Sequence, residues 1–468
     1  MSFKKQVFGV VSLLVICICA CGPTLTMPGN TLSNHYMPAT GVNTANLFLY
    51  CPDLLENHDL VAGVLKKEQA GVLRFPGGTT ANFYHPNLPG YGFRNEDLAL
   101  LKESGVKEHM GKVVQAEGRI LKKHGIDENF IYAFTKLVET TDHQVLYVAN
   151  LLSGTLEETL SVLNTFKRAG IRVSGVELGN EYYLKAYEER FASVRDYIDL
   201  AKVFAAGIRK EHPDVPISLV AAPTADIKSI SQREVEWNKA LAGLDFFEAV
   251  SVHFYPRSDR MIKLSPSPCT IEEAIEMGFN RPRKALRDLE QTFEGKELWL
   301  TEWNVAAAPK WCNNSIAHAF FTGLFQESLS ESKQLNVSIY HTLVSKSNGF
   351  NLYNPDPILG LKPLPNIQSF ELSAKLRSYL QATGVVWEKA VESLPDNCLQ
   401  FSFSNEKKET RAVVIYNAGG KEVAIDPEIS ISQHWELSAR SLEQGSLILK
   451  ENNQRVCDAG SISLFLIR

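Results

Sequence analysis

The sequence has 468 residues, of which 44% are hydrophobic and 22% charged, and its formal net charge is −5. This length is sufficient for one large domain and a smaller one. An acidic balance gives no electrostatic case for a nucleic-acid partner. After the N-terminal region, no apolar stretch reaches the ~20 residues of a membrane-spanning helix.

Residues 1–20 have the pattern of an export signal. Lys4 and Lys5 precede an apolar run from Val7 to Ala20, and Cys21 follows directly. The run has the length of a signal-peptide core and is short for a membrane span. Because "ICAC" resembles the lipobox of bacterial lipoproteins, we expect cleavage after residue 20 and lipidation of Cys21. The protein would then be anchored in a bacterial cell envelope, with an uncleaved N-terminal anchor helix as the alternative.

Eight apolar, β-branched runs follow, with amphipathic helical patterns such as 194–212 between them. Near-continuous apolar runs are typical of parallel strands that are buried on both faces. Eight such units over roughly 300 residues predict a (β/α)8 TIM barrel over 44–384, and a doubly wound sheet is the weaker option. The expected strands are 46–50, 71–78, 144–151, 175–181, 217–223, 248–256, 297–304 and 337–345.

The pattern changes after a last helical segment at 369–384. Residues 385–468 contain short alternating runs that are broken by Gly, Asn and Asp, without a long helical pattern. This texture is typical of antiparallel strands. We expect a small C-terminal β-sandwich domain, and residues 21–43 are a candidate for an extra strand of it.

Five cysteines remain once the leader and Cys21 are set aside. No CxxC pair occurs among them, so neither a structural zinc site nor another metal site is expected. In an exported chain, Cys269 with Cys312 and Cys398 with Cys457 are candidate disulfides, although sequence leaves the connectivity open.

Polar residues stand at the ends of several expected strands, where barrel enzymes hold their active sites. Glu181 ends the fourth strand and Glu302 the seventh, so the two carboxylates should face each other across the barrel mouth. Two facing carboxylates are the minimum machinery for glycoside hydrolysis, because one must donate a proton while the other stays ionised. The charge of one raises the pKa of the other. The polar residues at these ends are Arg74, Asn180, Glu181, His253, Tyr255 and Glu302.

These motifs carry a resemblance to known enzymes. "GNE" at 179–181 and "TEWN" at 301–304 resemble the acid/base and nucleophile motifs of clan A glycoside hydrolases. With "RFPGG" at 74–78 and "SVHFY" at 251–255, the set resembles the family 51 arabinofuranosidases. "VELGNE" and the small C-terminal β-domain are equally similar to the family 79 β-glucuronidase and heparanase group. The resemblance covers about residues 44 to 384.

The resemblance implies a retaining glycoside hydrolase that acts on a carbohydrate without a cofactor. Glu181 would be the acid/base and Glu302 the nucleophile. An arabinofuranosidase is the first candidate, and a β-glucuronidase-like or xylosidase-like enzyme is the alternative. A carbohydrate-binding lipoprotein without catalysis is a further hypothesis, which the presence of both carboxylates disfavours. A metal-dependent hydrolase would need more ligands than His253 and His341.

The resemblance also implies roles for the neighbouring residues. Asn180 would contact the sugar hydroxyl next to the anomeric carbon, and Tyr255 would orient the nucleophile. Arg74 would keep that carboxylate ionised, and His253 would line the floor of the site. In the alternative interpretation, Arg74 is an ion-pair partner in the barrel core and His253 is structural. Tyr182 and Tyr183 either form an aromatic platform for a sugar ring or merely cover the rim of the barrel.

Two difficulties follow from strand geometry. Asn180 and Glu181 cannot both point inward from a regular strand, because neighbouring side chains alternate. A bulge or the end of the strand must re-aim one of them. Glu177 would need a basic partner if it is buried.

Overall fold

The computed structural model divides into two compact units. One contains the described residues from Pro38 to Arg377, and the other contains β1 (Thr31–Leu32) and those from Ser378 to Ile467. The expected leader, Cys21, Cys269 and Cys312 lie outside the described residues. The described residues are 31–32, 38–55, 58–68, 71–223, 231–256, 275–305, 316–345, 351–356, 360–364, 367–382, 388–394, 398–426, 429–438, 448–450 and 455–467.

The first unit is a closed barrel of parallel strands. Each strand pairs with the next in sequence, and the last pairs with the first. This confirms the predicted TIM barrel. The strands are β2 (Ala39–Asn43), β3 (Val72–Phe75), β4 (Gln144–Val148), β5 (Val173–Leu178), β6 (Ile217–Val220), β7 (Ala249–Phe254), β8 (Glu297–Trp303) and β9 (Leu335–Tyr340).

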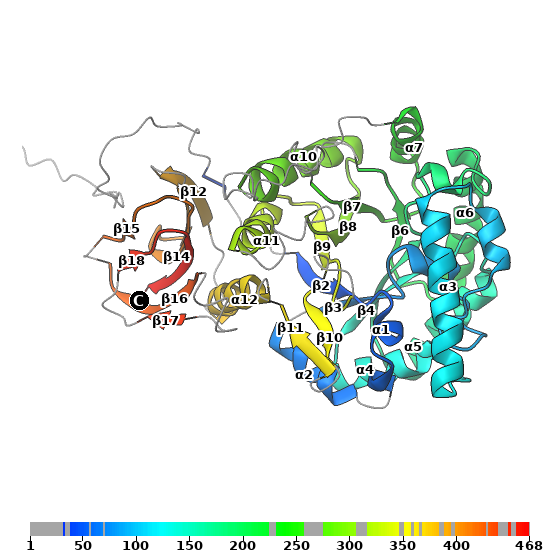
Figure 1. Ribbon diagram of the computed structural model, residues 1–468. Coiled ribbons are helices and arrows are strands. Elements are labelled where there is room, and N and C mark those ends of the chain that lie inside the picture. The colour runs from blue at the N-terminus through cyan, green and yellow to red at the C-terminus, as the bar shows by residue number, and fades with distance from the viewer. Residues whose placement is uncertain are drawn as a thin grey trace, which may run out of the picture. The chain divides into compact units, whose positions relative to one another are not determined.

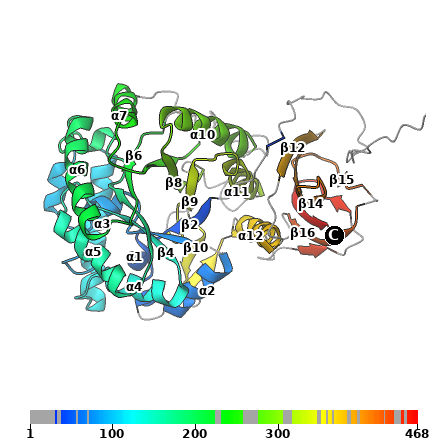
Figure 2. The same cartoon turned by 180° about the vertical axis from the view of Figure 1, so that it is seen from behind.

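Helices surround the barrel strands on the outside (Figures 1 and 2). The α-helices are α1 (Leu47–Tyr50), α2 (His58–Glu68), α3 (Gly105–His124), α4 (Phe130–Thr141), α5 (Leu156–Arg168), α6 (Val194–Glu211), α7 (Gln232–Ala242), α10 (Arg281–Thr292), α11 (Ile316–Leu329) and α12 (Ile367–Ala382). The other short elements are η1 (Pro52–Leu55), η2 (Thr79–Phe83), η3 (Glu96–Leu100), η4 (Lys185–Tyr187), the π-helix η5 (Glu276–Asn280), and a hairpin of β10 (Tyr353–Asp356) and β11 (Gly360–Pro363).

Apolar side chains fill the barrel interior. Val72, Leu146, Ala249, Trp299 and Ile339 form one buried cluster although they come from strands on different sides of the barrel. The interior is therefore packed and not a pore. Polar side chains are left to the carboxyl ends of the strands, which is where a site can form.

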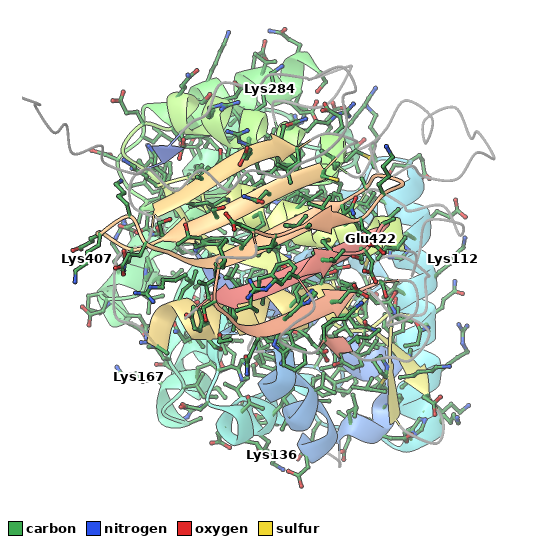
Figure 3. All side chains as sticks on the ribbon, turned by 90° about the vertical axis from the view of Figure 1, so that its left-hand side faces the viewer. Lys112, Lys136, Lys167, Lys284, Lys407 and Glu422 are labelled. Atoms are coloured by element: carbon green, nitrogen blue, oxygen red, sulfur yellow. The ribbon has the colours of Figure 1, made fainter. Side chains whose placement is uncertain are left out.

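The outer helices are amphipathic. In α6, Ile198, Ala201, Phe204 and Ile208 are buried at helical spacing, and a capping box at Ser193 starts the helix. Val203, which the apolar pattern of the sequence places with them, is exposed instead. Figure 3 shows side chains that project outward from four helices of this unit. They are Lys112 of α3, Lys136 of α4, Lys167 of α5 and Lys284 of α10.

The prediction of a first strand at 46–50 is wrong. Residues 47–50 form the short helix α1, and the first barrel strand is β2, which ends at Asn43, before the expected start of the barrel at residue 44. Leu47, Phe48 and Leu49 are buried in that helix. Periodicity alone cannot distinguish a short apolar strand from a buried helical turn.

The second unit is an antiparallel β-sandwich, which confirms the predicted fold of the C-terminal domain. One sheet has the order β1-β12-β13-β14-β19-β16-β17, and β15 pairs with β18 in a second. Thr31 and Leu32 pair with β12 at the edge of the large sheet. The strands are β12 (Glu388–Leu394), β13 (Cys398–Ser404), β14 (Thr410–Asn417), β15 (Val423–Ala424), β16 (Ile431–Leu437), β17 (Ile448–Lys450), β18 (Val456–Cys457) and β19 (Ser461–Ile467).

The expected disulfide between Cys398 and Cys457 is not formed. Both side chains are thiols in the apolar core between the two sheets. Cys398 Sγ donates to Asn417 Oδ1 at 2.9 Å, and Cys457 Sγ lies 3.7 Å from the Ile415 carbonyl oxygen. The two cysteines therefore contribute to this core as small apolar groups with weak donors.

No helix in the described part of the chain combines the length and apolar character that a membrane span requires.

Candidate active site

Two carboxylates meet at the carboxyl end of the barrel. Glu181 follows β5 and Glu302 lies in β8, as the sequence predicted. His253, from β7, connects them: its Nδ1 lies 2.9 Å from Glu181 Oε1 and 3.6 Å from Glu302 Oε2. Both carboxylates therefore contact one imidazole nitrogen.

Glu302 is surrounded by hydrogen-bond donors. Arg74 Nη1 donates to its Oε1 at 2.6 Å, and the Tyr255 hydroxyl donates to its Oε2 at 2.6 Å. Burial alone would raise the pKa of Glu302. The positive charges of His253 and Arg74, with the Tyr255 hydrogen bond, hold this pKa well below the usual range. Glu302 is an ionised carboxylate at neutral pH.

Arg74 is fully buried and serves both roles that the sequence left open. Its Nε and Nη2 donate to the two oxygens of Glu177 at 2.8 and 2.9 Å, which supplies the basic partner that the buried Glu177 requires. Nη2 also donates to Asn180 Oδ1 at 2.9 Å. The guanidinium is thus a barrel-core ion-pair partner and a neighbour of Glu302 at once.

The turn after β5 resolves the alternation of Asn180 and Glu181. The strand ends at Leu178, and Gly179 and Glu181 have φ angles of 103° and 54°. A Cβ at Gly179 would lie 1.9 Å from the ring of Tyr182, so only glycine fits there. The positive φ re-aims Glu181 and costs about 1–3 kcal/mol, which the surrounding contacts must offset.

Asn82, from η2, holds the backbone of this turn. Its Oδ1 accepts from the Asn180 amide at 3.0 Å, and its Nδ2 donates to the Asn180 carbonyl at 2.7 Å. The Asn180 side chain is buried, and its Nδ2 has no hydrogen-bond partner in the described part of the chain. That amide is therefore a donor available to a bound molecule.

One oxygen of Glu181 has two donors. His253 Nδ1 and the Tyr183 hydroxyl, at 2.9 and 3.3 Å, both point to Oε1. Burial lowers the pKa of His253, but the negative charges of Glu302 and Glu181 outweigh it and raise the pKa. His253 thus donates an N–H, and a proton on Glu181 belongs on Oε2. Tyr182, by contrast, is buried among aromatic rings and forms no platform.

Two residues of the site were not predicted as such: Asn43, and His341, which the sequence suggested only as a metal ligand. Asn43 Oδ1 accepts from the Ala45 amide at 2.9 Å, so its Nδ2 faces Glu302 Oε1 at 3.3 Å and His341 Nδ1 at 3.0 Å. His341 Nδ1 must then accept, which places the proton of a neutral ring on Nε2. Asn43 ends β2, so a correct prediction of this strand would have placed Asn43 with the other polar residues at the strand ends.

The described residues contain no group of three or more His, Cys, Asp and Glu side chains arranged to hold a metal ion. The carboxylates of this site are instead occupied by arginine, histidine, tyrosine and asparagine donors.

No protein-family model matches the chain, and no curated protein sequence matches it. Solved structures match it over most of its length. A family 51 α-L-arabinofuranosidase from Bifidobacterium longum has 11% sequence identity and a TM-score of 0.62, over 95% of this chain and 98% of that one. The α-L-arabinofuranosidase from Thermotoga maritima, in an arabinose complex, has 13% identity and a TM-score of 0.58, over 94% and 98%.

A 4-O-α-L-rhamnosyl-β-D-glucuronidase from Fusarium oxysporum has 10% identity and a TM-score of 0.59, over 94% of this chain and 98% of that one. Arabinofuranosidases and a glucuronidase, the two groups that the motifs resemble, thus share this fold. At such identities the likeness concerns the fold alone, a (β/α)8 barrel with a C-terminal β-domain.

Proposed function

We propose that this protein is a retaining glycoside hydrolase in which Glu302 is the nucleophile and Glu181 the acid/base. The observation that carries the proposal is the position of His253 Nδ1, 2.9 Å from one carboxylate and 3.6 Å from the other. The distance between Glu181 Oε1 and Glu302 Oε2 therefore cannot exceed the sum of these two distances. Retaining pairs are about 5–5.5 Å apart and inverting pairs about 6.5–9.5 Å, so the geometry favours retention.

The surroundings of the two carboxylates support this division of roles. Glu302 is the more buried and accepts from Arg74 and Tyr255, which suits a permanently ionised nucleophile. The Glu181 side chain is 21% exposed against 6% for Glu302, and both of its donors contact Oε1, not Oε2. A proton on that oxygen suits a general acid.

The reaction follows in two steps. The Glu302 carboxylate attacks the anomeric carbon as the glycosidic bond breaks, and Glu181 gives its proton to the departing oxygen. Glu181 then takes a proton from water, whose oxygen attacks the anomeric carbon and breaks its bond to Glu302. Asn180 Nδ2 donates to the sugar hydroxyl next to the anomeric carbon.

An α-L-arabinofuranoside is the first candidate substrate, since solved family 51 enzymes share the fold and the motifs resemble theirs. A β-glucuronidase-like specificity is the second candidate, on the likeness to the Fusarium enzyme. A xyloside is a third sugar to include in a screen.

A panel of 4-nitrophenyl glycosides, including arabinofuranoside, xyloside, glucoside and glucuronide, tests the function. We expect hydrolysis of at least one, with the first product formed in the retained configuration by proton NMR. Glu302→Ala should lose this activity, whereas Glu297→Ala, at the opposite end of β8, should keep it. An inverted first product, or equal activity of Glu302→Ala and wild type, contradicts the proposal.

A further inference from the structure

Arg233, near the start of α7, binds the backbone of the loop that carries Glu181. Its Nε donates to the Tyr183 carbonyl at 2.9 Å, and Nη2 donates to the Tyr182 carbonyl at 3.1 Å. On the far side of the loop, Nη2 donates to the Phe191 carbonyl at 2.7 Å and Nη1 to the Ala192 carbonyl at 3.1 Å. One guanidinium thus joins both ends of the segment 182–192.

The side chain is committed to this loop. Arg233 is half-buried, and its guanidinium carbon lies 5.2 Å from the ring centre of the buried Trp237. Among the residues that the structure describes, Arg233 forms no ion pair within 4.0 Å. Four carbonyl groups in a fixed arrangement require the planar fork of arginine, which a lysine ammonium cannot reproduce.

The loop that Arg233 holds needs external support. Glu181 has a φ of 54°, which a glutamate adopts only where its surroundings fix it. The Leu184 amide donates to the Glu181 carbonyl at 2.9 Å, and the Tyr183 hydroxyl contacts Glu181 Oε1. Arg233 is bonded to Tyr183 as well, so a short chain of contacts leads from α7 to the carboxylate.

We propose that Arg233 is a positioning residue for the general acid/base Glu181, acting through the backbone of residues 182–192. This inference rests on the proposed function. Arg233 does not touch the Glu302 side of the site, where Arg74, Tyr255 and Asn43 hold the nucleophile. Loss of Arg233 should therefore weaken proton donation and leave nucleophilic attack intact.

The test uses leaving groups of different basicity. A 2,4-dinitrophenolate leaves without protonation, whereas a phenolate depends on the general acid. We expect Arg233→Ala to lower kcat/KM for the phenyl α-L-arabinofuranoside by about 10²-fold and to leave the 2,4-dinitrophenyl compound near the wild-type value. If the screen identifies another sugar, its aryl glycosides replace these. Arg233→Lys should fall between Arg233→Ala and wild type for the phenyl compound.

Azide gives a second readout that a general loss of folding does not produce. It should raise kcat of Arg233→Ala on the 2,4-dinitrophenyl compound, because it replaces the water that a displaced Glu181 no longer activates. Arg209→Ala is the matched control: Arg209 is also half-buried and donates to a backbone carbonyl, that of Phe246, at the other end of the barrel. It should show neither effect.

The outcomes separate this inference from the proposed function. Inactivity of the wild type on every glycoside contradicts the function itself. An active wild type with an equal loss for all leaving groups in Arg233→Ala, or with no loss, overturns the role of Arg233. Where Arg233→Ala does not fold, Arg233→Lys decides in the same way, since a loss independent of the leaving group also overturns the role.

Discussion

At the scale of single residues, the site depends on one buried cation that serves three acceptors. Arg74 binds Glu177, Glu302 and Asn180, and its burial is offset only because all of these contacts are made. The neighbouring carboxylates raise the pKa of Arg74 despite its burial, so the guanidinium stays charged. A buried charge is tolerated where it is paired, and removal of one partner leaves the other uncompensated.

Arg74→Met should therefore cost stability and activity for separable reasons. We expect a loss of about 3–5 kcal/mol in the free energy of unfolding, because the buried carboxylate of Glu177 loses its partner. We also expect a fall in kcat of about 10²-fold or more, because Glu302 loses its charged donor. Urea unfolding and steady-state kinetics measure the two effects.

The double variant Arg74→Met/Glu177→Leu tests this separation. It replaces the ion pair by apolar groups, which is often nearly neutral for stability. We expect it to be more stable than Arg74→Met by about 2 kcal/mol and equally inactive. A double variant as unstable as Arg74→Met speaks against Glu177 as the source of the loss.

At the scale of elements, the helices hold the loops that shape the site. In α3, the buried Glu117 accepts from the amides of Tyr91 and Phe93 at 2.6 and 3.0 Å, in the loop between β3 and α3. Burial outweighs these hydrogen bonds and raises the pKa of Glu117 to about 7. The neutral acid is thus favoured in the folded protein, and this loop is tied to α3 in a pH-dependent way.

The stability contributed through Glu117 should fall as the pH rises. The pKa of Glu117 is about 7 in the folded protein, above the ordinary value of 4.5. Its contribution to stability is therefore complete below pH 4.5 and is lost as the pH rises to about 7. The loss should be on the order of 3 kcal/mol. Glu117→Gln cannot ionise, so its stability relative to wild type should improve by that amount from pH 4.5 to 8 in urea unfolding.

Glu108→Gln is the control for this measurement. Glu108 is on the same helix with its side chain 71% exposed, and Lys112 lowers its pKa, so it titrates below this range. A stability difference between Glu117→Gln and wild type that stays constant with pH argues against the raised pKa.

The sandwich unit allows a separate prediction about its thiols. Burial raises the pKa of the Cys457 thiol to about 12, and the thiolate is the reactive form. Cys398 and Cys457 should therefore resist iodoacetamide at pH 8 in the native protein. Without reductant, both should react once the protein is unfolded in about 8 M urea. A non-reduced peptide map that recovers the two as one linked peptide contradicts the thiol state.

At the scale of the whole molecule, long apolar strands and their polar ends were predictable from sequence, because burial on both faces leaves a continuous local pattern. The five-residue β2 was not, since it is short and lies next to a more apolar helix. The contacts of Arg74 with Glu177 and of Arg233 with Tyr183 join residues far apart in sequence. Such contacts leave no local signal, so the pairing of Arg74 with Glu177 and the part played by Arg233 emerged only from the fold.

The place of the molecule in the cell depends on the first 21 residues of the sequence. We propose that Cys21 carries a lipid that anchors the protein in a bacterial envelope, because a charged start and an apolar run precede it and it ends the segment "ICAC". Lipid chains add apolar area that partitions into membranes, and two or more give stable anchoring. Cys21→Ala should therefore leave the detergent phase of a Triton X-114 partition, while Cys19→Ala, two residues away, should remain in it. Equal partitioning of Cys21→Ala and wild type, with unchanged processing in the presence of globomycin, argues for an uncleaved anchor helix instead.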